Sequence, residues 1–355
     1  MMSAQVEWLW GPPTCPPHLA ALRERVSAFA ASPDLAALRE AARAEGLYGL
    51  ALPGRYGGLG LPLREWAHIA EVEGEHGPYV FGSAALLDLA VLPEDDPVRE
   101  DVARGLLTTC NAMTEPDAPG SDPSFTTTKA YRDTDGTWRV TGRKWFVSGA
   151  DRADLAYVLA RTGDGLSLLL SEAFQTEREL AVLGAGGQWE VTFDDAPARL
   201  LGAEGEGLRL IGRRVRLGRV LRCLNWLGQA QHAFTLMRDR ARARPSRAGR
   251  LADFQLVQQM VFESLLAIRQ CRPLVYDAAA LLAGGRDAAT EIGLAKVAAA
   301  RMLSQVADAA VQVHGAAGLG PDTPLPAIFR TGRTARILDG PDELHVASVA
   351  RRLLR

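Results

Sequence analysis

Apolar residues recur every three or four positions along the last third of the chain, the spacing that places them on one face of an α-helix. One stripe of this kind occupies residues 254–275 and a second occupies residues 292–313. A third helix is expected over about residues 207–240. Because long amphipathic helices must cover one another's apolar faces, residues 204–355 are predicted to form a C-terminal four-helix bundle.

Residues 1–110 combine helical stretches with turns rich in proline and glycine. Alanine, leucine, arginine and glutamate dominate residues 19–30 and 35–44, and a further helix is expected over 63–75, since these residue types lose little freedom in a helix. A turn at 53–58 precedes that last helix. The segment is predicted to be an N-terminal helical domain.

Residues 111–203 change to the pattern of β-strands. Residues 138–147 alternate between polar and apolar and contain aromatic and β-branched side chains, while shorter apolar runs occupy 155–161, 166–170 and 189–193. Short strands with frequent turns predict a small central antiparallel β domain. The fold class expected for the whole chain is α+β, mainly α.

Composition and charge narrow the choice of partners. The chain has 355 residues, of which 47% are hydrophobic and 23% charged, with a formal net charge of −2. No overall field would therefore attract nucleic acid or an anionic membrane. No run reaches the roughly 18 apolar residues of a membrane-spanning helix, and the opening residues lack the basic start of a signal peptide. A cytoplasmic protein with no membrane partner is expected.

The cysteines show neither a metal-binding nor a disulfide pattern. No Cys-x-x-Cys pair occurs among the four, which are Cys15, Cys110, Cys223 and Cys271. This spacing predicts no zinc site and no disulfide framework, so reduced thiols and no bound metal are expected.

A loop rich in proline, glycine, serine and aspartate begins at Met113. Its residues 114–122 read Thr-Glu-Pro-Asp-Ala-Pro-Gly-Ser-Asp and offer backbone N–H groups suited to a polar or anionic ligand. A solvated loop is the alternative interpretation, and the loop alone does not decide between the two.

This loop and several further segments together resemble the acyl-CoA dehydrogenase family. The loop is similar to the family's Thr-Glu-Pro…Gly-Ser-Asp signature, and the other segments follow in the family's order at 52–60, 144–148, 253–258, 312–318 and 339–343. The resemblance covers roughly residues 40–355. It implies the family's fold, in which helices, a small β domain and a helical bundle follow one another.

The resemblance also implies an FAD cofactor and its contacts. In the β region, the residues that would line the flavin and the pyrophosphate are Ala112, Met113, Thr114, Gly120, Ser121, Phe146, Val147 and Ser148. In the helical region they are Arg244, Gln255, Gln312, Gly315, Ala316, Pro341 and Glu343. Some of the latter contact the flavin of an adjacent subunit in the family, which implies a homodimer or homotetramer.

Without the family pattern, several of these residues could equally have a purely structural role. Trp145 and Phe146 on a strand would be plain core aromatics, and Gln312 with His314 would be a satisfied polar pair on a helix.

Asp339 takes the position of the family's catalytic base. Removing the proton α to a thioester requires a carboxylate that faces the carbon, and hydrogen-bond donors for the thioester oxygen. The resemblance assigns the base to Asp339, a contact with the substrate to the Gly340 backbone N–H, and a contact with the CoA part to Arg219. The family more often has Glu as its base, and the Asp-Gly-Pro-Asp-Glu form resembles one branch of it.

Two alternatives to Asp339 as the base follow from the same segment. Asp339 could instead cap a helix that begins near Pro341, because Asp is a favoured N-cap residue and Pro a favoured first residue. Asp342 or Glu343 could also supply the catalytic carboxylate.

The sequence departs from the family in several places. Residues 244–248 lack the Phe and Gly of the family's Arg-x-x-Phe-Gly segment, and the stretch 86–109 is shorter than its counterpart. Arginines crowd 209–222 and 238–250, which is typical of solvated helix faces but would also suit the phosphates of CoA or of nucleic acid.

The leading hypothesis is an acyl-CoA dehydrogenase of fatty acid metabolism, which would oxidise an acyl-CoA or acyl-carrier thioester to its α,β-enoyl product. Electrons would pass to an electron-transfer flavoprotein or a similar acceptor. Two alternatives remain open: a nitroalkane-oxidase-like flavoprotein, which also uses an Asp base, and a flavin-poor relative that binds DNA.

Overall fold

The computed structural model describes residues 7–29, 35–75, 81–163, 165–247 and 249–355. The chain groups into two compact units: a helical unit made of Met1–Pro53, Leu59–Ser83 and Arg216–Arg355, and a β unit made of Gly54–Gly58 and Ala84–Val215. The helical unit thus draws on both the first and the last of the three predicted segments, whose boundaries stay a prediction. The first six residues, on which part of the signal-peptide expectation rests, lie outside the described residues.

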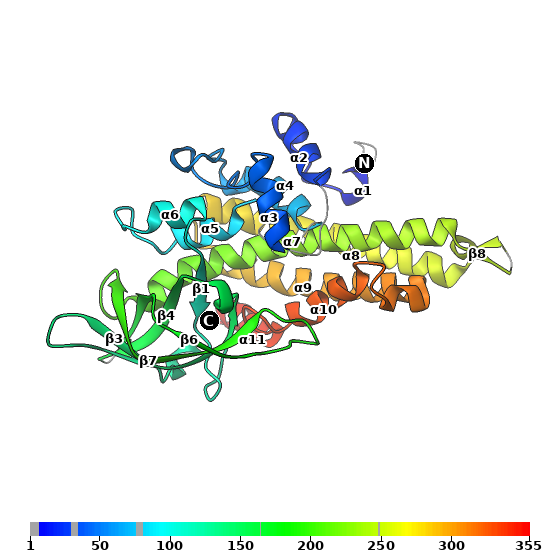
Figure 1. The fold of residues 1–355 in the computed structure, drawn as a ribbon. Coiled ribbons are helices and arrows are strands. Elements are labelled where there is room, and N and C mark those ends of the chain that lie inside the picture. The colour runs from blue at the N-terminus through cyan, green and yellow to red at the C-terminus, as the bar shows by residue number, and fades with distance from the viewer. Residues whose placement is uncertain (1–6, 30–34, 76–80, 164, 248) are drawn as a thin grey trace. The chain divides into compact units, whose positions relative to one another are not determined.

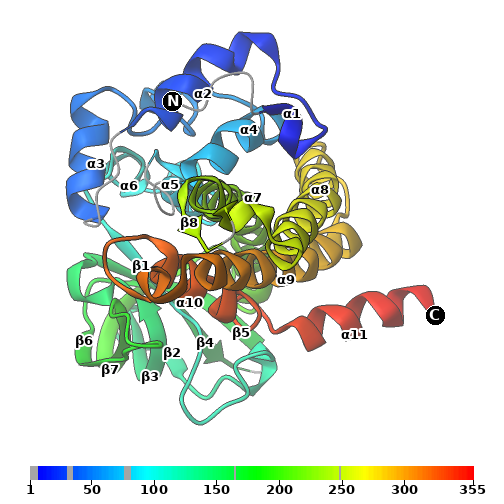
Figure 2. The ribbon, with the colours of Figure 1, turned by 90° about the vertical axis from the view of Figure 1, so that its right-hand side faces the viewer.

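The helical unit is built around long helices that run alongside one another (Figures 1 and 2). Its helices are α1 (Glu7–Trp10), α2 (Ala20–Ser27), α3 (Leu35–Ala44), α4 (Leu63–Glu73), α8 (Gln255–Ala283), α9 (Ala289–His314), α10 (Leu325–Ala335), α11 (Asp342–Leu353) and, from residue 216 onward, α7 (Gly207–Ala243). The helices expected over 35–44, 63–75 and 207–240 are confirmed to within three residues. The helix expected over 19–30 is shorter, because a 3₁₀ turn at Pro17–Leu19 precedes α2.

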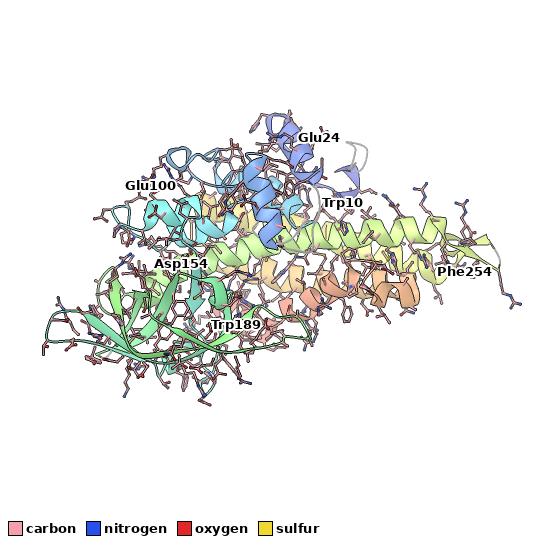
Figure 3. The ribbon with its side chains drawn as sticks, viewed as in Figure 1. Trp10, Glu24, Glu100, Asp154, Trp189 and Phe254 are labelled. Atoms are coloured by element: carbon pink, nitrogen blue, oxygen red, sulfur yellow. The ribbon has the colours of Figure 1, made fainter. Side chains whose placement is uncertain are left out.

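Small residues allow α4 and α7 to approach each other closely. A Cβ atom added at Gly228 of α7 would lie 1.9 Å from the Glu71 carbonyl oxygen, and one added at Gly74 would lie 2.2 Å from that of Asn225. Aromatic packing adds to this region: Trp10 of α1 (labelled in Figure 3) meets Phe234 of α7 edge-on, with ring centroids 5.6 Å apart. The contact between α4 and α7 therefore depends on glycine at both positions.

The β unit contains a seven-stranded sheet. Its strands are β1 (Thr109–Ala112), β2 (Lys129–Arg132), β3 (Trp138–Ser148), β4 (Leu155–Thr162), β5 (Gly165–Ser171), β6 (Gln175–Glu179) and β7 (Gln188–Leu201). The order is β1-β4-β2-β3-β7-β5, with β6 paired to β7 and β5 also paired to β4. The unit also includes α6 (Arg99–Arg104) and all but the first residue of α5 (Ser83–Leu89).

The sheet is mixed rather than purely antiparallel, which corrects the sequence prediction. Most neighbouring strands are antiparallel, but β1 pairs with β4 in parallel, from Thr109 opposite Leu155 to Ala112 opposite Val158. The β2–β3 hairpin lies between β1 and β4 in the sequence. A connection of this length permits parallel pairing, which a tight hairpin turn does not.

The burial of strand β4 explains why its sequence is a continuous apolar run. Leu155 and Tyr157 belong to one buried cluster, while Ala156, Val158 and Ala160 belong to another. Because successive side chains of a strand point to opposite faces, both faces of β4 are buried.

Within the described residues, no helix combines the length and the apolar character needed to cross a lipid bilayer. The four cysteines all lie in the described part of the chain, are buried and are not joined in disulfides.

Candidate active site

Asp339 lies in a tight turn of the helical unit, between α10 and α11. Its backbone φ is +55°, and that of Gly340 is +95°. Asp is one of the few residues that tolerate this left-handed region, where glycine is favoured. At Gly340 a Cβ atom would also lie 2.8 Å from Leu344 Cδ2 and 3.0 Å from His345 Nε2. The Asp-Gly sequence is thus what this turn requires.

Two side chains hold the Asp339 backbone carbonyl. Arg219 Nε donates a hydrogen bond to this oxygen at 3.0 Å, and His345 Nε2 lies 3.2 Å from it. Since a carbonyl only accepts, His345 carries its proton on Nε2. Burial, and then the charge of Arg219, lower the pKa of His345. His345 is therefore a neutral donor that fixes the turn.

The Asp339 carboxylate itself pairs with α7. Arg222 Nε lies 2.6 Å from Asp339 Oδ2, and the two side chains are 35% and 32% exposed. Arg219 and Arg222 are three residues apart, so they lie on the same face of α7. One arginine thus meets the backbone of Asp339 and the other its carboxylate, which stays accessible to a substrate.

Asp342, three residues further on, has a different environment. It is buried, and three cationic side chains surround it: Lys296 Nζ at 3.7 Å, Arg301 Nε at 3.2 Å and Arg336 Nε at 3.1 Å. It opens the first turn of α11, where the helix dipole also favours a negative charge. Burial lowers the pKa of Lys296, while Asp342 opposes this shift. Asp342 is thus enclosed by cations, which leaves it little access to a substrate.

Two alternatives remain for this segment: Asp339 as a helix cap, and Glu343 as the catalytic carboxylate. The N-cap of α11 is Pro341, and no side chain caps the helix there, so the interpretation of Asp339 as a helix cap is wrong. Glu343 is exposed in the first turn of α11.

In the β unit, a buried ion pair fixes the Thr-Glu-Pro segment. Lys144 Nζ lies 3.0 Å from Glu115 Oε1 and donates to the carbonyls of Met113 at 2.9 Å and Leu159 at 2.7 Å. Burial lowers the pKa of Lys144 to about 8, and Glu115 opposes this shift. Burial would raise the pKa of Glu115, but hydrogen bonds, first from Thr127, hold it at about 2. Met113 and the start of the loop are therefore rigidly held.

Beside this segment, β3 presents an exposed aromatic side chain. Phe146 has a φ of +51°, is 46% exposed, and lies at an irregularity in the pairing of β3 with β7. Trp145 donates its backbone N–H to the Thr114 carbonyl at 2.9 Å, and its buried Nε1 has no hydrogen-bond partner among the described residues. Val147 is buried, and the Ser148 hydroxyl bonds to Gln188 at the surface. Phe146 is therefore not a core aromatic.

In the loop of the β unit, Gly120 approaches the Thr114 side chain too closely for a residue with a Cβ atom. A Cβ atom added at Gly120 would lie 2.8 Å from Thr114 Cγ2. Gly120 and Ser121 are both exposed, so backbone is open to a ligand along this loop, while Ala112 is buried at the end of β1.

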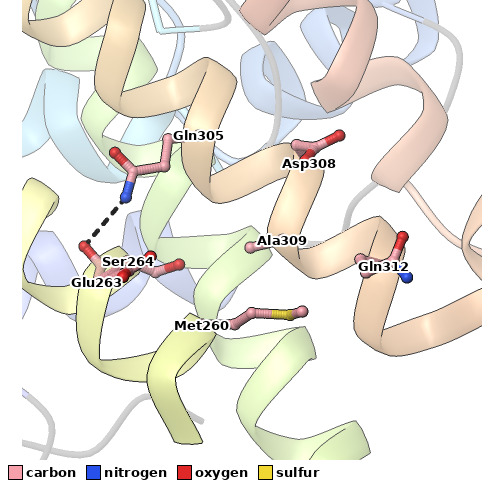
Figure 4. A pocket seen from close by; sticks show the side chains of 7 residues that line it. All are labelled: Met260, Glu263, Ser264, Gln305, Asp308, Ala309 and Gln312. Atoms are coloured by element: carbon pink, nitrogen blue, oxygen red, sulfur yellow. Dashed lines mark hydrogen bonds between the residues drawn. The ribbon is translucent and has the colours of Figure 1, made fainter. Parts of the chain in front are cut away.

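A third group of predicted residues lies on α8 and α9 of the helical unit. Arg244 is exposed just before a small hairpin of β8 (Pro245–Ser246) and β9 (Gly249–Arg250), and Gln255 is the exposed first residue of α8. Gly315 and Ala316 are exposed directly after α9. Figure 4 shows a pocket between α8 and α9, of about 170 Å³, lined by Met260, Glu263, Ser264, Gln305, Asp308, Ala309 and Gln312.

The predicted site residues lie in three regions of the structure. Arg219, Asp339, Gly340, Pro341 and Glu343 form one, and the β-unit residues around Thr114 and Trp145 form a second. The residues on and next to α8 and α9 form the third. Arg222 and His345 are partners of Asp339 that the sequence did not predict. The three-residue spacing of Arg219 and Arg222 was the available signal for Arg222.

Comparison with known proteins identifies the family. The acyl-CoA dehydrogenase C-terminal domain model matches residues 205–354 and the middle domain model matches residues 110–196, more than half of the chain. A protein of Rattus norvegicus named acyl-CoA dehydrogenase family member 11 is 33% identical over 347 aligned residues, which cover 88% of this chain and 44% of that protein. The chain belongs to the acyl-CoA dehydrogenase family.

Two further relatives match this chain over most of their own length. The Mycobacterium tuberculosis protein named probable acyl-CoA dehydrogenase FadE2 is 32% identical, and the match covers 90% of this chain and 86% of that protein. A solved structure of a protein assigned as an acyl-CoA dehydrogenase from Mycobacterium abscessus is 28% identical, covers 99% of this chain and 98% of that one, and has a TM-score of 0.84. By contrast, this chain spans less than half the length of the family member 11 relative.

Proposed function

We propose that this chain is an FAD-dependent dehydrogenase that oxidises an acyl thioester, of CoA or of a carrier protein, to its α,β-enoyl product, with Asp339 as the base. The observation that carries the proposal is the turn at Asp339. Its backbone is held by Arg219 and His345, while its carboxylate is one-third exposed. A general base needs this combination of fixed position and access to the substrate proton.

The residues of the β unit fit a flavin. A flat aromatic ligand can stack on the exposed Phe146, and the Ser148 hydroxyl and the exposed backbone at Gly120 and Ser121 offer polar contacts in the same unit. The buried, unpartnered Trp145 Nε1 supports a polar group nearby. We assign this role to Ala112, Met113, Thr114, Gly120, Ser121, Phe146, Val147 and Ser148.

We also assign cofactor contacts to groups of the helical unit. Arg244 would meet the diphosphate of FAD, and the other contacts would come from Gln255, Gln312, Gly315, Ala316, Pro341 and Glu343. In a homodimer or homotetramer, some of these residues would serve the flavin of an adjacent subunit. When bound, FAD supplies the acceptor for the hydride that leaves the substrate β-carbon.

The chain's own residues have distinct tasks in this reaction. Asp339 removes the α-proton, and the Gly340 backbone N–H binds the thioester carbonyl oxygen and stabilises the developing enolate. Arg219 holds the base through its backbone. Because a guanidinium has five N–H donors, we also assign Arg219 a contact with the CoA part of the substrate.

Partners and compartment are part of the proposal. An electron-transfer flavoprotein or similar acceptor would reoxidise the enzyme. The four buried cysteines, which are not joined in disulfides, are consistent with the reducing cytoplasm.

The test is an absorption spectrum of the purified protein with and without added FAD, followed by anaerobic titration with a panel of acyl-CoAs. A bound-flavin spectrum that bleaches with one thioester is the expected result and defines the acyl group. Oxygen consumption with a nitroalkane and no response to thioesters would favour the oxidase alternative. Refusal of FAD, with salt-sensitive retention of duplex DNA, would favour a binding protein that uses the arginines of 238–250.

A further inference from the structure

The strongest unassigned feature of the helical unit is the ion pair between Arg222 and Asp339. The two groups are 117 residues apart in sequence, yet Arg222 Nε and Asp339 Oδ2 are 2.6 Å apart. Both side chains are about one-third exposed, and an ion pair so open to solvent contributes little to the free energy of unfolding. Stability therefore does not explain why an arginine faces the proposed base.

Resting on the proposed function, we propose that Arg222 is a positioning residue for abstraction of the α-proton. Before the reaction, its ion pair with the carboxylate fixes the side-chain orientation of Asp339. After proton transfer, its positive charge is no longer balanced by Asp339 and offsets the negative charge that has formed on the substrate.

The charge balance of the step supports this role. The substrate Cα–H bond breaks, its proton forms a bond to an Asp339 carboxylate oxygen, and the electron pair remains on the substrate as a thioester enolate. Asp339 becomes neutral while Arg222 keeps its charge, since a guanidinium does not release its proton. The net charge of the pair therefore rises by one as that of the thioester falls by one, and the two opposite charges attract each other.

Arg219 cannot supply the same effect. Its Nε donates to the Asp339 backbone carbonyl, and that group does not change its charge when the carboxylate takes up a proton. Arg222 is bonded to the reacting carboxylate itself. The two arginines, one helical turn apart, thus have separate tasks.

The test isolates proton abstraction from hydride transfer. The probe is an acyl-CoA with sulfur in place of the β-carbon, which keeps its α-protons but has no β-hydride to give. Its exchange of α-protons for solvent deuterium is followed by mass spectrometry, and its binding is measured separately by titration calorimetry. The variants are Arg222→Gln, Arg222→Lys and, as a matched control on the same helix, the exposed Arg216→Gln.

Arg222→Gln is expected to slow exchange at saturating probe about 10- to 100-fold, with Kd and Tm little changed. Arg222→Lys should recover most of the rate, because it keeps the charge, and Arg216→Gln should behave as the wild type. Exchange by Arg222→Gln within twofold of the wild type, or an effect confined to Kd, would overturn the inference alone. If the wild type neither exchanges α-protons nor reduces its flavin with any thioester, both the proposed function and the inference about Arg222 are wrong.

Discussion

Two of the arginine–carboxylate pairs in the helical unit, Arg272–Glu71 and Arg222–Asp339, have sharply different environments. Arg272 of α8 meets Glu71 of α4 through two contacts, Nε to Oε1 at 2.8 Å and NH2 to Oε2 at 2.9 Å, with both side chains fully buried. Arg222 Nε meets Asp339 Oδ2 at 2.6 Å, and these two side chains are about one-third exposed. A buried pair cannot lose a partner without leaving a charge unsolvated, whereas an exposed pair can open at little cost. Burial therefore separates an ion pair that holds helices together from one that is able to react.

The buried pair is also part of a larger network. Tyr276 and Gln231 both donate hydrogen bonds to the Glu71 carboxylate, and Arg272 NH1 reaches the carbonyl of Pro13 at 2.6 Å. The Glu71 carboxylate therefore links helices α4, α7 and α8, and Arg272 extends the network to the segment at Pro13.

The largest effect is expected from the exposed pair, on activity. Asp339→Asn should lower the rate of anaerobic flavin reduction about 10²- to 10⁴-fold, because the amide cannot accept the α-proton. FAD binding and Tm should stay close to those of the wild type, since the pair is exposed. Stopped-flow absorbance measures the rate, and Asp322→Asn is the matched control, an exposed aspartate of the same unit. A wild-type rate in Asp339→Asn would exclude Asp339 as the base.

The next largest effect is expected from the buried pair, on stability. Arg272→Met should lower the free energy of unfolding by about 3–5 kcal/mol, because the Glu71 carboxylate would remain buried without its cation. Thermal unfolding measures the change, with Arg286→Met as a control on an exposed arginine. If the Arg272→Met protein is as stable as the control, the buried pair does not contribute more to the free energy of unfolding than the exposed one, which would contradict the prediction.

A smaller effect is expected at Gly340, next to the base. Gly340→Ala should cost about 1–3 kcal/mol of strain and lower kcat on the order of tenfold, because the new methyl would displace His345 and with it the Asp339 carbonyl. Gly285→Ala is the matched control: its φ is +68°, but a Cβ atom there meets nothing within 4 Å. If both variants lost the same fraction of kcat, the loss could not be attributed to the turn at Asp339.

The smallest effect is the pH dependence of the buried pair. Burial alone would raise the pKa of Glu71, but Arg272 and the hydrogen bonds from Arg272 and Tyr276 lower it from 4.5 to about 2. A lowered carboxyl pKa stabilises the fold above pH 4.5, and this contribution is lost as the pH falls toward 2. The Tm of the wild type should therefore fall more between pH 6 and pH 3 than that of Glu71→Gln. Parallel declines would contradict the lowered pKa of Glu71.

The periodicity of the sequence was sufficient for the long elements. Residues 292–313 lie within α9, and residues 254–275 lie within α8 except for Phe254, its N-cap residue, because a helix that packs on one side must repeat its apolar residues at helical spacing. The sequence was insufficient for strand direction, where β1 and β4 pair in parallel. It was also insufficient at residue 19, where a 3₁₀ turn replaces the expected start of the helix.

The sequence likewise predicted some features of the candidate site, whereas others were apparent only in the structure. By itself, the sequence determined the Asp-Gly-Pro-Asp-Glu segment, its family and the proposed role of Asp339, because those depend on the order of residues along the chain. Only the tertiary structure decided that Arg222 meets the Asp339 carboxylate, that His345 holds its carbonyl, and that Asp342 is enclosed by three cations. Those contacts join residues far apart in the sequence or depend on burial, and neither distance nor burial is written in local spacing.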